Sequence, residues 1–256
     1  MRKGAVGGAA LLVLLAGCVR AVPYEGDEPR LQGPPEVQLD VVHRHARQFD
    51  VEVPDRRAGS QQELAAGSYI LGHLQLAGYA PRLDRVPVGD AVNSTNVVAF
   101  PPGGGEPEFV VTVPYDSPRS GDHSYGTEIG IFLEVARALM VADPEHRVGF
   151  VALGAESADH RGTRRLARFL LDEGVGPSVI SLSGVRSGPR AEDGVVVWGA
   201  CQEGHAIESS ALSRRCEEPV DNDDVITAAG FEHTWIGGDP EPLARELFGF
   251  LTAARS

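Results

Sequence analysis

Helix-type and strand-type hydrophobic patterns alternate along most of this chain, and this alternation restricts the fold more than any other feature of the sequence. Short apolar runs, such as residues 109–113, have the length and β-branched composition of buried strands. Longer stretches, such as residues 129–141, carry apolar residues three and four positions apart, which is typical of an amphipathic helix. Strands that alternate with helices pack as a sheet between helical layers. The sequence therefore predicts an α/β fold.

Turn and capping residues set the limits of the individual elements. Ser60 and Glu63 have the spacing of a capping box at the start of a helix that Gly78 ends. Further helices are expected over 38–49, 129–141, 163–173 and 243–253, and strands over 82–88, 96–100, 109–113, 147–153, 179–182 and 195–198. Prolines and glycines at 101–105 predict a hairpin-like loop between the second and third of these strands. No internal repeat and no linker is visible after residue 40, so we expect one domain.

The first residues have the pattern of an export signal. Arg2 and Lys3 precede an apolar stretch, residues 5–15, that is too short to span a membrane comfortably. The sequence Leu-Ala-Gly-Cys at 15–18 resembles the bacterial lipobox, in which the cysteine becomes the lipid-modified first residue. We predict a signal peptide over 1–17, lipidation of Cys18 and a flexible tether over 18–39. The alternative is an ordinary secretory signal with a cysteine there by chance.

Such a signal places the chain in a bacterial cell envelope, on the exported side and anchored to a membrane by lipid. An exported protein meets an oxidising compartment, so we expect Cys201 and Cys216 to form a disulfide, with two unpaired thiols as the alternative. The formal net charge of −13 disfavours nucleic acid and anionic membrane surfaces as partners.

Seven segments, in order, resemble the M28 family of zinc-dependent exopeptidases, which are aminopeptidases with two metal ions. They are RAGS followed by AAGSYILGHLQLAGYAP, then NVVA, VVTVPYDS, GIFLEVARAL, RVGFVALGAESADHRGTRRLA, VISLSGV and AAGFEHTWIGGD. The resemblance covers about residues 40–253. It implies that residues 40–256 form a three-layer α/β/α sandwich with a mixed, mainly parallel central sheet.

The resemblance also implies where the metal ligands of the family fall, and most of those positions hold residues that do not bind zinc. The family reaction uses two zinc ions bridged by a carboxylate and a water, and zinc takes imidazole, thiolate or carboxylate ligands. Where the family has a histidine, the bridging aspartate, a glutamate and a further aspartate, this chain has Pro114, Ser124, Ser157 and Ser183. Crowded carboxylates without a metal repel each other, so a site emptied of zinc is expected to acquire small hydroxyls.

Three positions keep the residue type that the family uses. Glu156 matches the general base that takes the proton of the water, and His233 matches the last metal ligand. Asp116 matches the aspartate that orients the histidine replaced here by Pro114. Without zinc, Glu156 is expected to be a vestigial base.

Two interpretations follow. The first is a membrane-tethered, non-catalytic domain without a resident cofactor that binds a peptide, a cell-wall fragment or an envelope protein. The second is an active zinc aminopeptidase with a rebuilt site made of Asp116, Asp122, His123, Glu156 and His233. The sequence leaves open whether the chain is an enzyme.

Overall fold

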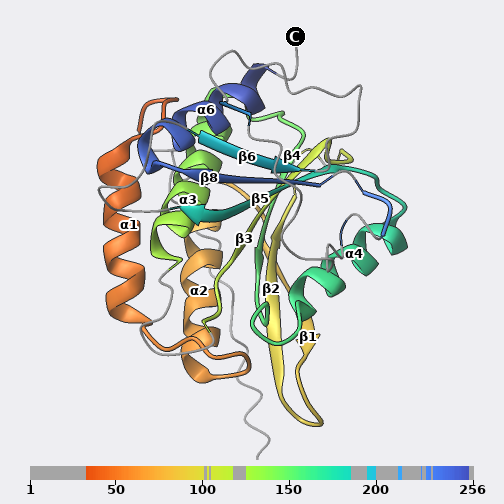
Figure 1. Cartoon of the computed structure of the whole chain (residues 1–256). Coiled ribbons are helices and arrows are strands. Elements are labelled where there is room, and N and C mark those ends of the chain that lie inside the picture. Colours follow the sequence, from red (N-terminus) through yellow and green to blue (C-terminus); the bar gives the residue numbers. More distant parts are fainter. Residues whose placement is uncertain are drawn as a thin grey trace, which may run out of the picture. The chain divides into compact units, whose positions relative to one another are not determined.

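A mixed β-sheet runs between layers of helices (Figure 1). The structure is a computed structural model, and it describes residues 33–100, 103, 105–117, 125–185, 195–199, 213–214, 226, 229–231 and 233–253. Within these residues the sheet has eight strands in the order β1-β2-β4-β3-β5-β8-β6-β7. The strands are β1 (Arg82–Pro87), β2 (Asn93–Ala99), β3 (Phe109–Pro114), β4 (Val148–Leu153), β5 (Ser178–Val185), β6 (Val195–Gly199), β7 (Ser213–Arg214) and β8 (His233–Gly238).

The strands β4, β3, β5 and β8 at the centre of the sheet run parallel to one another. On one side β2 pairs antiparallel with β4, and β1 pairs antiparallel with β2. On the other side β6 pairs antiparallel with β8 and parallel with β7. The predicted mixed, mainly parallel sheet is therefore confirmed.

The strands β2 and β3 are not neighbours, and the predicted hairpin-like loop between them was wrong. β4 lies between them, antiparallel to β2 and parallel to β3. All six residues of β4 are buried, and a strand buried on both faces is stable in the middle of a sheet rather than at its edge. Proline and glycine mark where a chain turns, but they do not specify which strands pair afterwards.

Helices cover both faces of the sheet, which confirms the predicted three-layer α/β/α sandwich. One layer contains α1 (Leu39–Glu52), α2 (Gln61–Leu76), α3 (Gly126–Ala142) and α6 (Pro240–Ala253), and α4 (Arg161–Glu173) lies on the opposite face (Figure 1). Side chains alternate along a strand, so Val111 and Val113 of β3 pack in the core under the first layer. Val110 packs in a second core with Leu166 and Leu170 of α4.

Two side chains of α3 hold the segment that precedes α1. The Arg137 guanidinium donates hydrogen bonds to the carbonyl oxygens of Pro34 and Glu36 at 2.9 and 2.8 Å, and it pairs with the buried Glu134 carboxylate. Glu134 also accepts the N–H of Gln38 at 2.8 Å. These bonds hold the segment just before α1 against α3.

Several predicted features fall outside the described residues. They are the signal peptide over 1–17, the lipidation site Cys18, and the cysteines Cys201 and Cys216. Across the described ranges, no helix combines the length and the apolar character that are needed to cross a bilayer.

The predicted start of α2 can be tested by removing its cap. The Ser60 hydroxyl accepts the N–H of Glu63 at 3.1 Å, as a capping box requires. We expect Ser60→Ala to lower the free energy of unfolding by about 1 kcal/mol, because that N–H loses its partner. Urea denaturation measures the change. Ser68→Ala is the matched control, since Ser68 is exposed in the same helix, and its expected effect is within about 0.5 kcal/mol. An equal loss in both variants would contradict the cap.

Candidate functional site

The carboxyl ends of β3 and β4 lie side by side, because Pro114 pairs with Leu153 in a parallel register. After β3 the chain continues into Asp116, and after β4 it continues into the turn 154–160. The carboxyl ends of parallel strands are where open α/β sheets usually bind their ligands. We call residues 114–117 and 154–163 the site edge.

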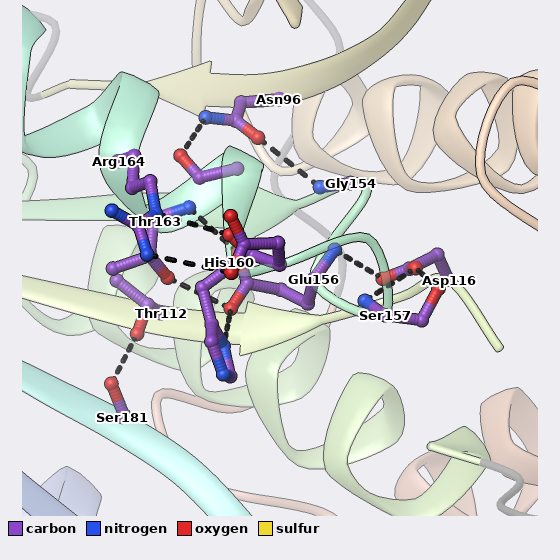
Figure 2. Close-up of polar contacts among 12 residues, drawn as sticks. Asn96, Thr112, Asp116, Gly154, Glu156, Ser157, His160, Thr163, Arg164 and Ser181 are labelled. Carbon is purple, nitrogen blue, oxygen red and sulfur yellow. Dashed lines mark hydrogen bonds and ion pairs between the residues drawn. The ribbon is translucent and has the colours of Figure 1, made fainter. Parts of the chain in front are cut away.

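Asp116 links the two halves of the site edge. Its side chain is 1% exposed, and its carboxylate accepts the N–H groups of Glu156 and Ser157, each at 2.9 Å (Figure 2). The Ser157 hydroxyl also donates to it. Burial raises the pKa of Asp116, while the hydrogen bonds from Ser157 and Glu156 act in the opposite direction. The carboxylate therefore fastens the turn after β4 to the end of β3.

Glu156 caps the first turn of α4. One carboxylate oxygen accepts the Thr163 N–H at 2.6 Å, and the other accepts the Thr163 hydroxyl at 2.9 Å (Figure 2). The second oxygen also lies 3.3 Å from Nδ1 of His160. The N-terminus of a helix favours negative charge, so this carboxylate is held by α4 itself. The candidate general base thus has both oxygens in internal hydrogen bonds.

The turn between β4 and α4 has an unusual backbone. Ala155, Asp159 and His160 adopt left-handed conformations, with φ of 57°, 62° and 50°, although none of them is glycine. Such residues cost free energy and persist only where the surroundings hold them. A Cβ atom at Gly162 would lie 2.2 Å from the Gly154 carbonyl oxygen, so the turn also packs closely against the start of α4.

Glu63 is a site-edge partner whose role the sequence did not reveal. Its side chain is 2% exposed, and it accepts hydrogen bonds from the Ser94 hydroxyl at 2.6 Å, from the Ala155 N–H at 3.0 Å and from the Gly59 N–H. Burial raises the pKa of Glu63, and the bonds from Ser94, Gly59 and Ala155 oppose that shift. Its position in the Ser-x-x-Glu pattern was the available signal, but that pattern predicts only a local cap.

Two further side chains complete this polar network. The buried Asn96 accepts the Gly154 N–H at 3.1 Å and donates to the Gly162 carbonyl at 2.9 Å (Figure 2). The buried Arg56 donates to the carbonyl oxygen of Tyr115 at 2.8 Å, just before Asp116. The site edge is thus supported by α2, β2 and the segment after α1.

The remaining predicted residues are distributed as follows. Pro114 is the last residue of β3, Ser157 is exposed in the turn beside Asp116, and Ser183 belongs to β5. Asp122, His123 and Ser124 lie outside the described residues. The structure thus brings Pro114, Asp116, Glu156 and Ser157 together at the site edge.

His233 lies elsewhere on the sheet. It is the first residue of β8 and pairs with Val179, which in turn pairs with Val110 of β3. Val110 precedes Pro114 by four residues, so His233 lies about 13 Å from the level of Pro114 along the strand direction. His233 Nε2 lies 2.7 Å from the Ser181 hydroxyl, which lies 2.7 Å from the Thr112 hydroxyl. Asp116 and His233 therefore do not meet.

The ligands that a zinc pair needs are not assembled in the part of the chain that the structure describes. Within it, no group of three or more histidine, cysteine, aspartate or glutamate side chains is arranged to hold a metal ion. At the site edge, Pro114 offers no donor atom, and the Ser157 hydroxyl already donates to Asp116. The described residues of the site edge do not fit a zinc pair.

The sequence matches no protein-family profile and no curated protein. The fold matches solved structures, among them a Bacteroides vulgatus protein assigned as a zinc-dependent exopeptidase, with a TM-score of 0.65 and 16% identity over 86% of this chain and 95% of that one. A leucine aminopeptidase precursor from Bacteroides thetaiotaomicron matches with a TM-score of 0.64 and 14% identity, over 86% of this chain and 97% of that one. The chain shares the zinc-exopeptidase fold.

The same fold also serves another reaction. A glutaminyl cyclase from an Acidobacteriales bacterium matches with a TM-score of 0.65 and 14% identity, over 90% of this chain and 98% of that one. At these identities the likeness establishes the architecture and carries no activity to this chain.

The role of Asp116 predicts a clear loss of stability when one of its acceptor oxygens is replaced. In Asp116→Asn an amide N–H₂ replaces one acceptor oxygen and faces a backbone donor, so we expect the free energy of unfolding to fall by about 2–3 kcal/mol. Urea denaturation measures it. Asp159→Asn is the control, because the Asp159 side chain is 74% exposed in the same turn. If both variants lose the same amount, Asp116 does not fasten the turn.

Glu63 predicts a pH dependence with a defined sign. Folding raises the pKa of Glu63 above its ordinary value of 4.5. Between the pKa of the unfolded state and the higher pKa of the folded state, the folded state therefore binds more protons than the unfolded state does. The stability that Glu63 contributes is therefore greatest below pH 4.5 and declines as the pH rises through the folded pKa. We expect the stability of the wild type relative to Glu63→Gln to fall over that interval. Urea denaturation across the pH range measures it, and a difference that grows with pH would refute the assignment.

Proposed function

We propose that this protein is a membrane-tethered, non-catalytic domain with the zinc-exopeptidase fold, and that it binds a peptide, a cell-wall fragment or an envelope protein. One observation carries the proposal. The two carboxylates kept at the site edge, Asp116 and Glu156, are both occupied by backbone N–H groups of their own fold.

The chemistry of those hydrogen bonds supports the absence of metal catalysis. A carboxylate that binds zinc directs a lone pair at the cation. The oxygens of Asp116 instead accept two N–H groups and a hydroxyl, and Glu156 accepts donors from the first turn of α4. Metal binding would break these bonds and leave buried donors unpaired, which costs about 1–3 kcal/mol for each. Pro114 and Ser157 supply no ligand in compensation.

The proposal of a membrane tether is supported by the lipobox-like residues at 15–18 and by the composition of the segment that follows. An acyl chain contributes about 0.8 kcal/mol for each buried methylene, so lipid on Cys18 would hold a soluble domain at a membrane. A domain held in this way acts on molecules that reach the membrane surface, and peptides and cell-wall fragments meet that condition.

The metal content of the full chain tests the non-catalytic part of the proposal. The purified protein is dialysed against trace zinc, its bound zinc is measured, and aminoacyl chromogenic substrates are added. We expect no zinc pair and no hydrolysis above that of Glu156→Gln, because the site edge lacks the ligands. Two equivalents of zinc, with turnover abolished in Glu156→Gln, would instead establish the rebuilt aminopeptidase.

A further inference from the structure

Two imidazoles and a phenol meet between α1 and α2, away from the site edge. His45 comes from α1, and Tyr69 and His73 come from α2. His73 is ten residues along α2 from Glu63, which corresponds to about 15 Å of helix. All three side chains are half-buried, so solvent reaches them in part. None of them belongs to the polar network of the site edge.

The distance between the two imidazole rings fits a single shared metal ion. The ring centres of His45 and His73 are 4.5 Å apart. A metal bound to an imidazole lies about 2.0–2.1 Å from the nitrogen, and hence about 3.2 Å from the ring centre. Two such rings at a right angle around one ion have centres about 4.5 Å apart, whereas the tetrahedral angle of zinc requires about 5.2 Å. The observed spacing agrees with the value for right-angle geometry.

The surroundings of His45 also resemble those of a ligand. Its Nδ1 lies 2.8 Å from the Tyr69 hydroxyl. A metal-binding histidine commonly uses its second nitrogen in a hydrogen bond that fixes the ring, and this leaves Nε2 of His45 for the ion. Within the described residues, His73 makes ring contacts with His45 and Tyr69, and no hydrogen bond involves its ring nitrogens.

We propose that His45 and His73 form a binding site for Cu²⁺, with Tyr69 positioning the His45 ring and water filling the other coordination positions. Cu²⁺ prefers tetragonal sites with nitrogen and oxygen ligands, and it binds such sites more tightly than the other common divalent metals do. The ion would bridge α1 and α2. This site is independent of the proposed function, because it uses no residue of the site edge.

One acidic and one basic side chain near this site have opposite electrostatic effects on it. The Glu52 carboxylate at the end of α1 interacts electrostatically with His73 and Tyr69, which favours a cation. Arg44 acts on His45 in the opposite sense, but its guanidinium pairs with Asp40 at 3.7 Å on the exposed side of α1.

Copper titration of the full chain tests the proposal. Electron paramagnetic resonance of the frozen complex reports the number of nitrogen ligands, and competition with a chelator reports affinity. The wild type is expected to bind one Cu²⁺ with two imidazole nitrogens. His45→Ala and His73→Ala should each weaken binding by at least about tenfold and lose the two-nitrogen signal, and Tyr69→Phe should weaken it by about tenfold with both nitrogens kept.

His43→Ala is the matched control, since His43 is exposed on α1 two residues from His45, and it should bind as the wild type does. Circular dichroism checks that each variant is folded, and His73→Gln replaces His73→Ala if the alanine variant is not. Cu²⁺ should also raise the melting temperature of the wild type and of His43→Ala by more than that of His45→Ala and His73→Ala. Unchanged copper binding in the His73 variant, or a wild-type spectrum without two nitrogens, would overturn the proposal. Zinc measurements at the site edge do not bear on this outcome.

Discussion

The hydrogen bonds between the Asp116 carboxylate and the N–H groups of Glu156 and Ser157 hold the site edge together. They join the end of β3 to the turn after β4, two segments about forty residues apart in the chain. Removing the acceptor would leave backbone donors in a buried place without a partner. Because the turn leads directly into α4, the same bonds also determine where Glu156 and Thr163 lie. The left-handed residues of the turn are tolerated in this setting.

Three acidic side chains at or beside this edge, Glu63, Asp116 and Glu156, share one kind of partner. Each accepts at least one backbone N–H, so amide dipoles and the N-terminus of α4 offset their charge. In a metalloenzyme, cations would offset comparable charge. The architecture of the zinc exopeptidases is therefore combined here with an edge whose acids stabilise the fold. That combination is the physical basis of the proposed binding role.

Local patterns in the sequence predicted the elements better than they predicted their neighbours. Ser60 and Glu63 marked the start of α2, and the apolar run at 109–113 marked β3. The position of β4 between β2 and β3 was not predictable from the prolines and glycines at 101–105, because strand pairing depends on contacts distant in sequence. The strand β8 was not predicted as a strand, since its six residues include two glycines and little alternation.

The sequence by itself determined which chemical groups are present at the site edge. A proline at 114 and a serine at 157 cannot supply imidazole or carboxylate ligands in any fold. Only the tertiary structure decided what the retained groups do, because hydrogen bonds between distant segments direct Asp116 and Glu156 toward backbone N–H groups and strand register separates His233 from both. The pairing of His45 with His73 depends on helix packing in the same way.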